Sequence, residues 1–203
     1  MLPMNFLGHL YFSGDDHALM YANLFGDFVK GSDLSSYPQS IRNGIVLHRN
    51  IDQYIDHHPA VAELMPKLYP KLPKVSAIAV DLFFDHLLAS RWSEFHPMDY
   101  RDFLNAFYAH PIAHRRDYSI EFLDFINRLR ENDWMFYYRT SWGLDKMCSG
   151  VGSRLSFPNT LHIAPKVFDE LKDTIEEIFE RYMHDAIPHF KQIIQSLENE
   201  PRA

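Results

Sequence analysis

We expect the rest of this chain to pack around the stretch Ser76–Trp92, S-A-I-A-V-D-L-F-F-D-H-L-L-A-S-R-W. It contains no glycine or proline and is almost wholly apolar, which predicts a buried helix of about four turns with Ser76 as its N-cap. Asp81 and Asp85 are four residues apart and therefore share one face of that helix. No lysine or arginine lies three or four positions from either acid. The two carboxylates must therefore be compensated from elsewhere in the fold.

Uncompensated carboxylates on a buried helix are costly. A like-charge pair at this spacing loses about 0.2–0.5 kcal/mol even when it is exposed. Burial adds a larger penalty unless a cation or a hydrogen-bond network compensates the charge. A divalent metal ion is a compact solution, because it neutralises several carboxylates at once. The alternative is that an arginine or lysine from another helix pairs with Asp81 and Asp85.

Composition limits the class of protein. The 203 residues are 46% hydrophobic and 15% aromatic, which predicts one folded domain over residues 1–203 with a sizeable core. The single cysteine, Cys148, excludes an internal disulfide and fits a reducing compartment. We find no signal peptide and no apolar run of about 18 residues, so we expect a cytoplasmic protein without a membrane span. The formal net charge of −7 argues against a non-specific nucleic-acid binder.

Helical periodicity also runs through the rest of the chain. No period-2 alternation of useful length occurs, so the sequence predicts an all-α, single-domain helical bundle. We expect Asp16 to cap a helix that reaches about Gly31, and Pro59 to stop a helix that begins at residues 36–38. Further helices are predicted over residues 60–69, 100–109, 118–132 and 134–147. An irregular stretch should follow at residues 150–159, and Pro188 should interrupt the last helix, which begins after Pro165.

Acids and histidines gather in four otherwise apolar segments. A histidine and an aspartate one helical turn apart, as in His48-x-x-x-Asp52, can hold a metal ion from one helix face. Two such helices packed together would enclose a site of imidazoles and carboxylates. This ligand set suits Mn²⁺, Fe²⁺ or Zn²⁺, and its carboxylate share favours Mn²⁺ or Mg²⁺. Structural His–Asp hydrogen bonds or satisfied core histidines are the alternatives. The candidate residues are His9, Asp27, His48, Asp52, Asp81, Asp85 and His86.

Other kinds of catalytic motif have little support. Cys148 has no histidine at helical spacing, and no G-x-S-x-G or Walker-type loop occurs. The segment Gly150-Val151-Gly152-Ser153-Arg154 could hold an anion, although a turn is the more frequent role of a lone G-x-G.

Four segments resemble the acyl carrier protein phosphodiesterase family, which is related to the HD-domain metal-dependent phosphohydrolases. They are M-N-F-L-G-H-L at Met4–Leu10, L-F-G-D-F-V-K-G at Leu24–Gly31, L-H-R-N-I-D at Leu47–Asp52, and D-L-F-F-D-H-L-L-A-S-R-W at Asp81–Trp92. The resemblance implies an HD-domain-like fold. It also implies removal of the 4′-phosphopantetheine group from holo-acyl carrier protein, with Mn²⁺ favoured and Mg²⁺ or Fe²⁺ as other options. On these motifs His9, Asp27, His48, Asp52, Asp81, Asp85 and His86 occupy family positions. Two departures stand out: Asp85-His86 reverses the His-Asp order of HD enzymes, and Asn50 replaces a basic residue.

The sequence therefore predicts a metal-dependent phosphodiesterase. We expect His48, Asp52, Asp81 and Asp85 to be the inner metal ligands, while Asp27 and His86 are ligands or position water and leaving group. Two other functions stay open: a phosphohydrolase that acts on a small-molecule or nucleotide phosphodiester, and a non-catalytic helical binding protein. The candidates for binding phosphate oxygens are Lys30, Arg49 and Arg154.

Overall fold

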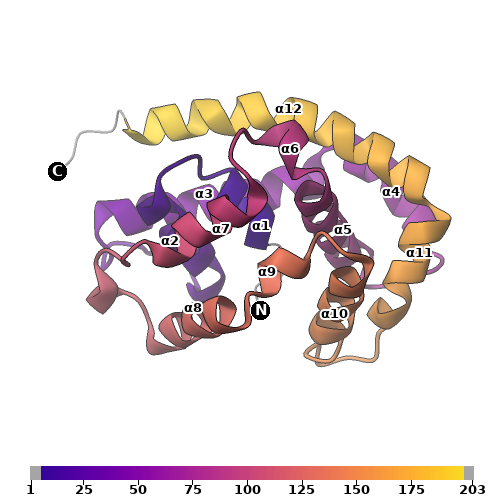
Figure 1. Ribbon diagram of the computed structural model, residues 1–203, viewed down its shortest axis with the longest axis horizontal. Coiled ribbons are helices and arrows are strands. Elements are labelled where there is room, and N and C mark those ends of the chain that lie inside the picture. The colour runs from indigo at the N-terminus through magenta and orange to yellow at the C-terminus, as the bar shows by residue number, and fades with distance from the viewer. Residues whose placement is uncertain (1–5, 199–203) are drawn as a thin grey trace.

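The computed structural model describes residues 6–198, and over that range the chain is all-α (Figure 1). The predicted fold class is therefore confirmed. Met4 and Asn5 of the first motif lie outside the described residues. The described residues form twelve α-helices: α1 (Phe6–Tyr11), α2 (His17–Phe25), α3 (Gln39–His57), α4 (Pro59–Leu68), α5 (Ser76–Ser90), α6 (Trp92–Phe95), α7 (Tyr100–Ala109), α8 (Ile120–Asn132), α9 (Trp134–Tyr137), α10 (Ser141–Gly152), α11 (Ala164–Glu170) and α12 (Lys172–Glu198). Three 3₁₀ turns join them: η1 (Gly26–Phe28), η2 (Arg115–Asp117) and η3 (Leu161–Ile163).

Helix α5 lies at the centre of the bundle, as its apolar sequence predicts. It contacts α1, α4, α10 and α12, and eleven of its residues are buried. The long helix α12 (yellow in Figure 1) runs along one side of the molecule and packs on α3, α4 and α5. Buried hydrophobic side chains from α1 to α12 form one core cluster. The core thus holds α1, α3 and α5, which carry most of the candidate site residues, in fixed positions.

Helices α2 and α3 pack closely against each other. Asp16 caps α2 as predicted, because its carboxylate accepts the backbone N–H groups of Ala18 and Leu19. A Cβ atom on Gly44 would lie 2.2 Å from the Cβ of Ala22, so only glycine allows this approach. Helix α2 ends at Phe25 rather than near Gly31, and the next three residues form η1.

Several predicted element boundaries were wrong. Ser76 does not cap α5: it is the first helical residue, and its hydroxyl donates backwards to the carbonyl of Leu72. Residues 150–152 are not irregular but complete α10, which Thr140 begins by accepting the N–H of Gly143. Pro188 does not interrupt α12. Its side chain is exposed, and the buried neighbours Ala186 and Phe190 hold the helix on the core on both sides. Over residues 6–198, no helix is long and apolar enough to cross a membrane.

Candidate metal centre

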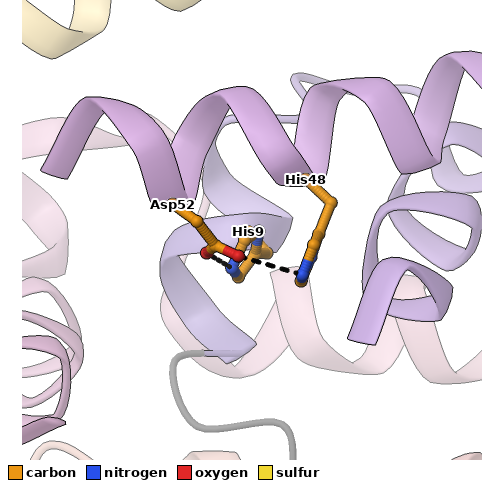
Figure 2. A group of neighbouring side chains, drawn as sticks. All are labelled: His9, His48 and Asp52. Carbon is orange, nitrogen blue, oxygen red and sulfur yellow. Dashed lines mark ion pairs between the residues drawn. The ribbon is translucent and has the colours of Figure 1, made fainter. Parts of the chain in front are cut away.

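Three side chains from two helices converge on one point. His48 and Asp52 lie one turn apart on α3, and His9 reaches them from α1 (Figure 2). The Nε2 atoms of His9 and His48 lie 3.3 Å and 3.2 Å from the two carboxylate oxygens of Asp52. One ligand atom from each residue lies within 4.8 Å of the others. This spacing is compatible with three ligands of a single ion.

Asp27 approaches the same group from η1. Its carboxylate oxygen lies 3.6 Å from the Nε2 atom of His48. The turn brings Asp27 close because Gly26 has no side chain: a Cβ atom there would lie 2.3 Å from the Cγ atom of His48. The structure therefore brings together four predicted residues, namely His9, Asp27, His48 and Asp52. Over residues 6–198, no arginine or lysine forms an ion pair with Asp27 or Asp52.

The ring of His9 is oriented by Asn23. The side-chain nitrogen of Asn23 donates to the His9 carbonyl and to the Ser13 hydroxyl, so its oxygen is left to accept. That oxygen lies 2.8 Å from Nδ1 of His9, which places the proton on Nδ1 and leaves a lone pair on Nε2. Outer partners of this kind are typical of metal-binding histidines. Asn23 was not among the predicted site residues, because only the folded chain brings it to His9.

The pKa shifts within the group are those expected for one proton shared between His48 and Asp52. Burial would lower the pKa of His48, but hydrogen bonds to Asp27 and Asp52 outweigh it and raise the pKa to about 9. Burial opposes ionisation of Asp52, yet the hydrogen bond from His48 and the electrostatic contacts with both histidines hold its pKa well below the ordinary value. Burial and the neighbouring His48 lower the pKa of His9. Near neutral pH the metal-free group is thus an ionised Asp52, a protonated His48 and a neutral His9.

The two imidazole rings stack with a centroid separation of 4.2 Å and an angle of 18°. Two positive charges at this distance would repel strongly, which agrees with a single proton between them. A divalent cation would replace that proton and bind both Nε2 atoms and the carboxylates. Imidazole nitrogen with carboxylate oxygen is a donor set for Mn²⁺, Fe²⁺ or Zn²⁺. The residues present therefore fit a metal ion.

A cavity of about 780 Å³ opens beside this group. Asp27 and Asp52 line one part of it, and Asp56 and Asp81 add further carboxylates. Lys74 and Arg154 supply the positive charges of its wall. The volume lies within the range of about 300–1,000 Å³ that is usual for small-ligand pockets. A cation site and a basic wall in one cavity suit a phosphate-containing ligand.

Asp81 faces this cavity from α5. Its pKa is raised well above the ordinary value by burial, and further by the charges of Asp52, Asp56, Asp85 and Asp27. Within residues 6–198 we find no ion pair or hydrogen bond to its carboxylate. Burial and these neighbouring acids therefore disfavour the charged form of Asp81 at the cavity wall in the metal-free protein.

Asp85 and His86 are not brought to the His–Asp group. The two carboxylate oxygens of Asp85 accept the backbone N–H groups of Leu7 and Gly8 at 3.0 Å and 2.8 Å, so they cap the start of α1. Burial nevertheless raises the pKa of Asp85 to about 7. His86 points in another direction, where its Nδ1 atom lies 2.6 Å from the Tyr138 carbonyl. The contacts of Asp85 are thus with the backbone of α1, and its role as an inner ligand with Asp81 stays a prediction.

The predicted phosphate-binding residues have different positions. Arg154 lines the cavity, although it follows a helix end and not an anion-binding loop. Arg49 donates to the carbonyl of Gly31 at 2.6 Å and so anchors the segment after η1. Lys30 is exposed and does not line the cavity. Lys74 lines it instead, with a positive φ of 66°. Such a conformation is uncommon outside glycine, and non-glycine residues that adopt it are found preferentially at functional sites.

Fold and site together define an all-α protein in which two buried histidines meet a partly exposed aspartate beside a ligand-sized cavity. The sequence model of the family described as acyl carrier protein phosphodiesterase matches residues 4–186. This chain belongs to that family.

Curated relatives support the assignment. A protein of Enterobacter sp. (strain 638) named acyl carrier protein phosphodiesterase is 28% identical over 177 residues, covering 87% of this chain and 92% of that protein. A Salmonella dublin protein of the same name is 30% identical over 183 residues, with the same coverage of both chains. A Klebsiella pneumoniae protein of that name is 27% identical over 180 residues, covering 88% of this chain and 93% of that protein. No solved structure matches this chain.

Proposed function

We propose that this protein is a divalent-metal-dependent phosphodiesterase that removes 4′-phosphopantetheine from holo-acyl carrier protein and leaves apo-acyl carrier protein. The observation that carries the proposal is the convergence of His9, His48 and Asp52 beside a cavity with basic and acidic walls. The family and the names of the relatives supply the substrate. Cytoplasmic location and the relation to HD-domain phosphohydrolases stay predictions.

The metal ligands in this proposal are His9, His48 and Asp52, with Asp27 as a fourth. Mn²⁺ is favoured because these four residues offer both imidazole and carboxylate donors. Fe²⁺ and Mg²⁺ are the other options. When bound, such an ion supplies Lewis-acid polarisation of a phosphoryl oxygen and lowers the pKa of a water molecule. Asn23 keeps the Nε2 lone pair of His9 directed at the site.

The reaction assigns separate tasks to the cavity residues. Lys74 and Arg154 hold non-bridging phosphate oxygens. Water attacks phosphorus and releases one proton to solvent, and the bond from phosphorus to the serine oxygen of the carrier protein breaks with its electron pair left on that oxygen. Asp81, which lines the same cavity, donates a proton to that serine oxygen. The products are a serine hydroxyl group and 4′-phosphopantetheine as a phosphomonoester.

The direct test incubates the protein with holo-acyl carrier protein and Mn²⁺ and follows loss of phosphopantetheine by mass spectrometry. We expect complete conversion by the wild-type protein and a loss of activity of about 100-fold or more in Asp52→Asn. Asp124→Asn is the matched control, because Asp124 is an exposed acid on α8 away from the cavity. Full activity of Asp52→Asn would contradict the ligand assignment.

A second readout separates the substrate from the chemistry. If the wild-type protein leaves holo-acyl carrier protein intact but hydrolyses a small aryl phosphodiester with Mn²⁺, the substrate is a small-molecule diester instead. If neither is hydrolysed and no metal binds in equilibrium dialysis, the phosphodiesterase proposal fails. Asp81→Asn should lower turnover of holo-acyl carrier protein by about 10²–10⁴-fold, because an amide cannot supply the proton.

A further inference from the structure

A second, smaller cavity adjoins the first. It has a volume of about 280 Å³ and lies between α1, α5, α8, α9 and α10. Val151 and Arg154 line both cavities, so the two share a wall. The second cavity is built mainly from aromatic and aliphatic side chains, and Lys146 is its other charged residue besides Arg154.

The mouth of this cavity exposes three large aromatic side chains. Trp134, Tyr137 and Trp142 are 41%, 42% and 57% exposed. The rings of Tyr137 and Trp142 meet edge to face at a centroid distance of 5.2 Å, and the Lys146 ammonium lies 5.7 Å from the Trp142 ring. Single exposed hydrophobic residues are common, but a cluster beside a cavity indicates a binding surface.

The polar groups of this aromatic cavity are available to a ligand. Within residues 6–198, the indole N–H groups of Trp134 and Trp142 have no hydrogen-bond partner, whereas that of Trp92 donates to the Met98 carbonyl. Tryptophan combines a large apolar face with one donor. The cavity can therefore cover an uncharged chain and also donate to carbonyl groups along it.

We propose that the aromatic cavity binds the thiol end of the pantetheine arm while the phosphate of the same substrate lies in the larger cavity, beside Lys74 and Arg154. This inference rests on the proposed function. Three observations favour this occupant. The shared wall at Val151 and Arg154 makes the two cavities adjacent. A volume near 280 Å³ suits one part of a ligand, because whole small-ligand pockets measure about 300–1,000 Å³.

The third observation is chemical complementarity. Pantetheine is uncharged, and its two amide carbonyl groups accept hydrogen bonds of the kind that indole N–H groups donate. Its terminal sulfur is polarisable, and sulfur packs favourably against aromatic rings. The cavity therefore adds a specificity site for the arm, separate from the site that holds phosphate.

A binding experiment tests the aromatic cavity without catalysis. The probe is reduced pantetheine alone, which has no phosphate and cannot be hydrolysed, and binding is followed by ligand-observed NMR. We expect saturable binding to the wild-type protein and an affinity about 10-fold lower for Trp142→Ala. Tyr69→Ala is the matched control, because Tyr69 is also an exposed aromatic residue, at 58%, but does not line this cavity. Circular dichroism and thermal unfolding verify that each variant is folded.

Kinetics complete the test. Trp142→Ala should lower kcat/KM for holo-acyl carrier protein by about 10-fold, whereas the control Tyr69→Ala should leave it unchanged. Unchanged kcat/KM for holo-acyl carrier protein, together with absent pantetheine binding, would overturn this inference and leave the proposed function intact. If the wild-type protein does not hydrolyse holo-acyl carrier protein, the proposed function fails. The cavity assignment is then supported only if pantetheine binds and Trp142→Ala weakens that binding, and it fails otherwise. If the wild-type protein is a dimer that Trp142→Ala dissociates, and pantetheine binding is unchanged, the aromatic cluster serves self-association and the inference is overturned.

Discussion

At the scale of single residues, the His9–His48–Asp52 group depends on where one proton lies. Asp52 is ionised and shares the proton of His48. His9 stays neutral, because its Nδ1 proton is held by Asn23 and its Nε2 lone pair faces the site. The same arrangement that binds a proton is suited to bind a cation. Metal affinity should therefore be coupled to pH.

We predict that the apparent affinity for Mn²⁺ rises with pH. The metal must displace the His48 proton, whose pKa is about 9, so affinity should increase by up to about tenfold per pH unit between pH 6 and 8. Isothermal titration calorimetry in buffers of different ionisation enthalpy measures both the affinity and the proton released. An affinity that is constant over this range, with no proton release, would show that His48 is not a ligand.

The same proton predicts the pH dependence of stability in the metal-free protein. The pKa of His48 is raised on folding, so its contribution is fully present below pH 6.5 and is lost as the pH rises through about 9. Asp85 acts in the same direction, because its pKa is raised from 3.8 to about 7. We expect a lower free energy of unfolding at pH 9.5 than at pH 6, measured by urea denaturation with a chelator present. Equal stability at both values would contradict this.

At the scale of elements, short connections position the site more than the long helices do. Turn η1 brings Asp27 to His48 only because residue 26 has no side chain. Helix α1 has only six residues, and Asp85 satisfies two N–H groups at its start. Both features act on the site without belonging to the His–Asp group itself.

Gly26→Ala should weaken metal binding while helix content is kept. The added Cβ atom would lie 2.3 Å from the His48 ring and must push it away from Asp27 and Asp52. A loss of about 10–100-fold in Mn²⁺ affinity is expected, similar to that of outer-shell mutations. In the control Gly150→Ala, the nearest atom to the new Cβ is 3.5 Å away on a flexible side chain. That variant should bind Mn²⁺ like the wild-type protein.

Asp85→Asn separates a capping role from a ligand role. An amide can accept through one atom only, so a buried N–H group of α1 loses its partner, at a cost of about 1–3 kcal/mol in the free energy of unfolding. Metal stoichiometry, measured by equilibrium dialysis, should remain that of the wild-type protein. Loss of the bound metal without loss of stability would restore Asp85 as an inner ligand.

At the scale of the whole molecule, the site joins α1 and α3, which share α2 as a neighbour and otherwise pack on different helices. Helix α1 contacts α2 and α5, while α3 contacts α2, α4 and α12. A ligand that bridges α1 and α3 therefore stabilises the bundle as a unit. The expected gain follows from mass action, because only the folded chain assembles the site.

Addition of Mn²⁺ should raise the melting temperature of the wild-type protein. A free metal concentration of 100 times Kd adds about 2.7 kcal/mol, which corresponds to about 5–10 °C for a domain of this size. Differential scanning fluorimetry with and without a chelator measures the shift. Asp52→Asn should show little shift, whereas the exposed-site control Asp124→Asn should shift like the wild-type protein. An equal shift in Asp52→Asn would place the bound ion elsewhere.

The all-α class, the central helix α5 and the pairing of His48 with Asp52 could all be predicted from the sequence. These features depend on periodicity and on spacing within one helix, which geometry fixes before any helix packs on another. The resemblance of four motifs also indicated the family. Boundaries were less reliable, as Ser76 and Pro188 show, because backward hydrogen bonds and burial of neighbouring residues decide them.

Only the tertiary structure decided which of the acids and histidines meet. Asp81 and Asp85 share a helix face, but one turn is enough to bring Asp81 to the cavity and Asp85 to the start of α1. His86 follows directly in the chain yet lies against Tyr138. Asn23 and Lys74 entered the site without any motif. The reason is physical: the rotation of each helix and its partners are set by packing of the whole core, which no local spacing encodes.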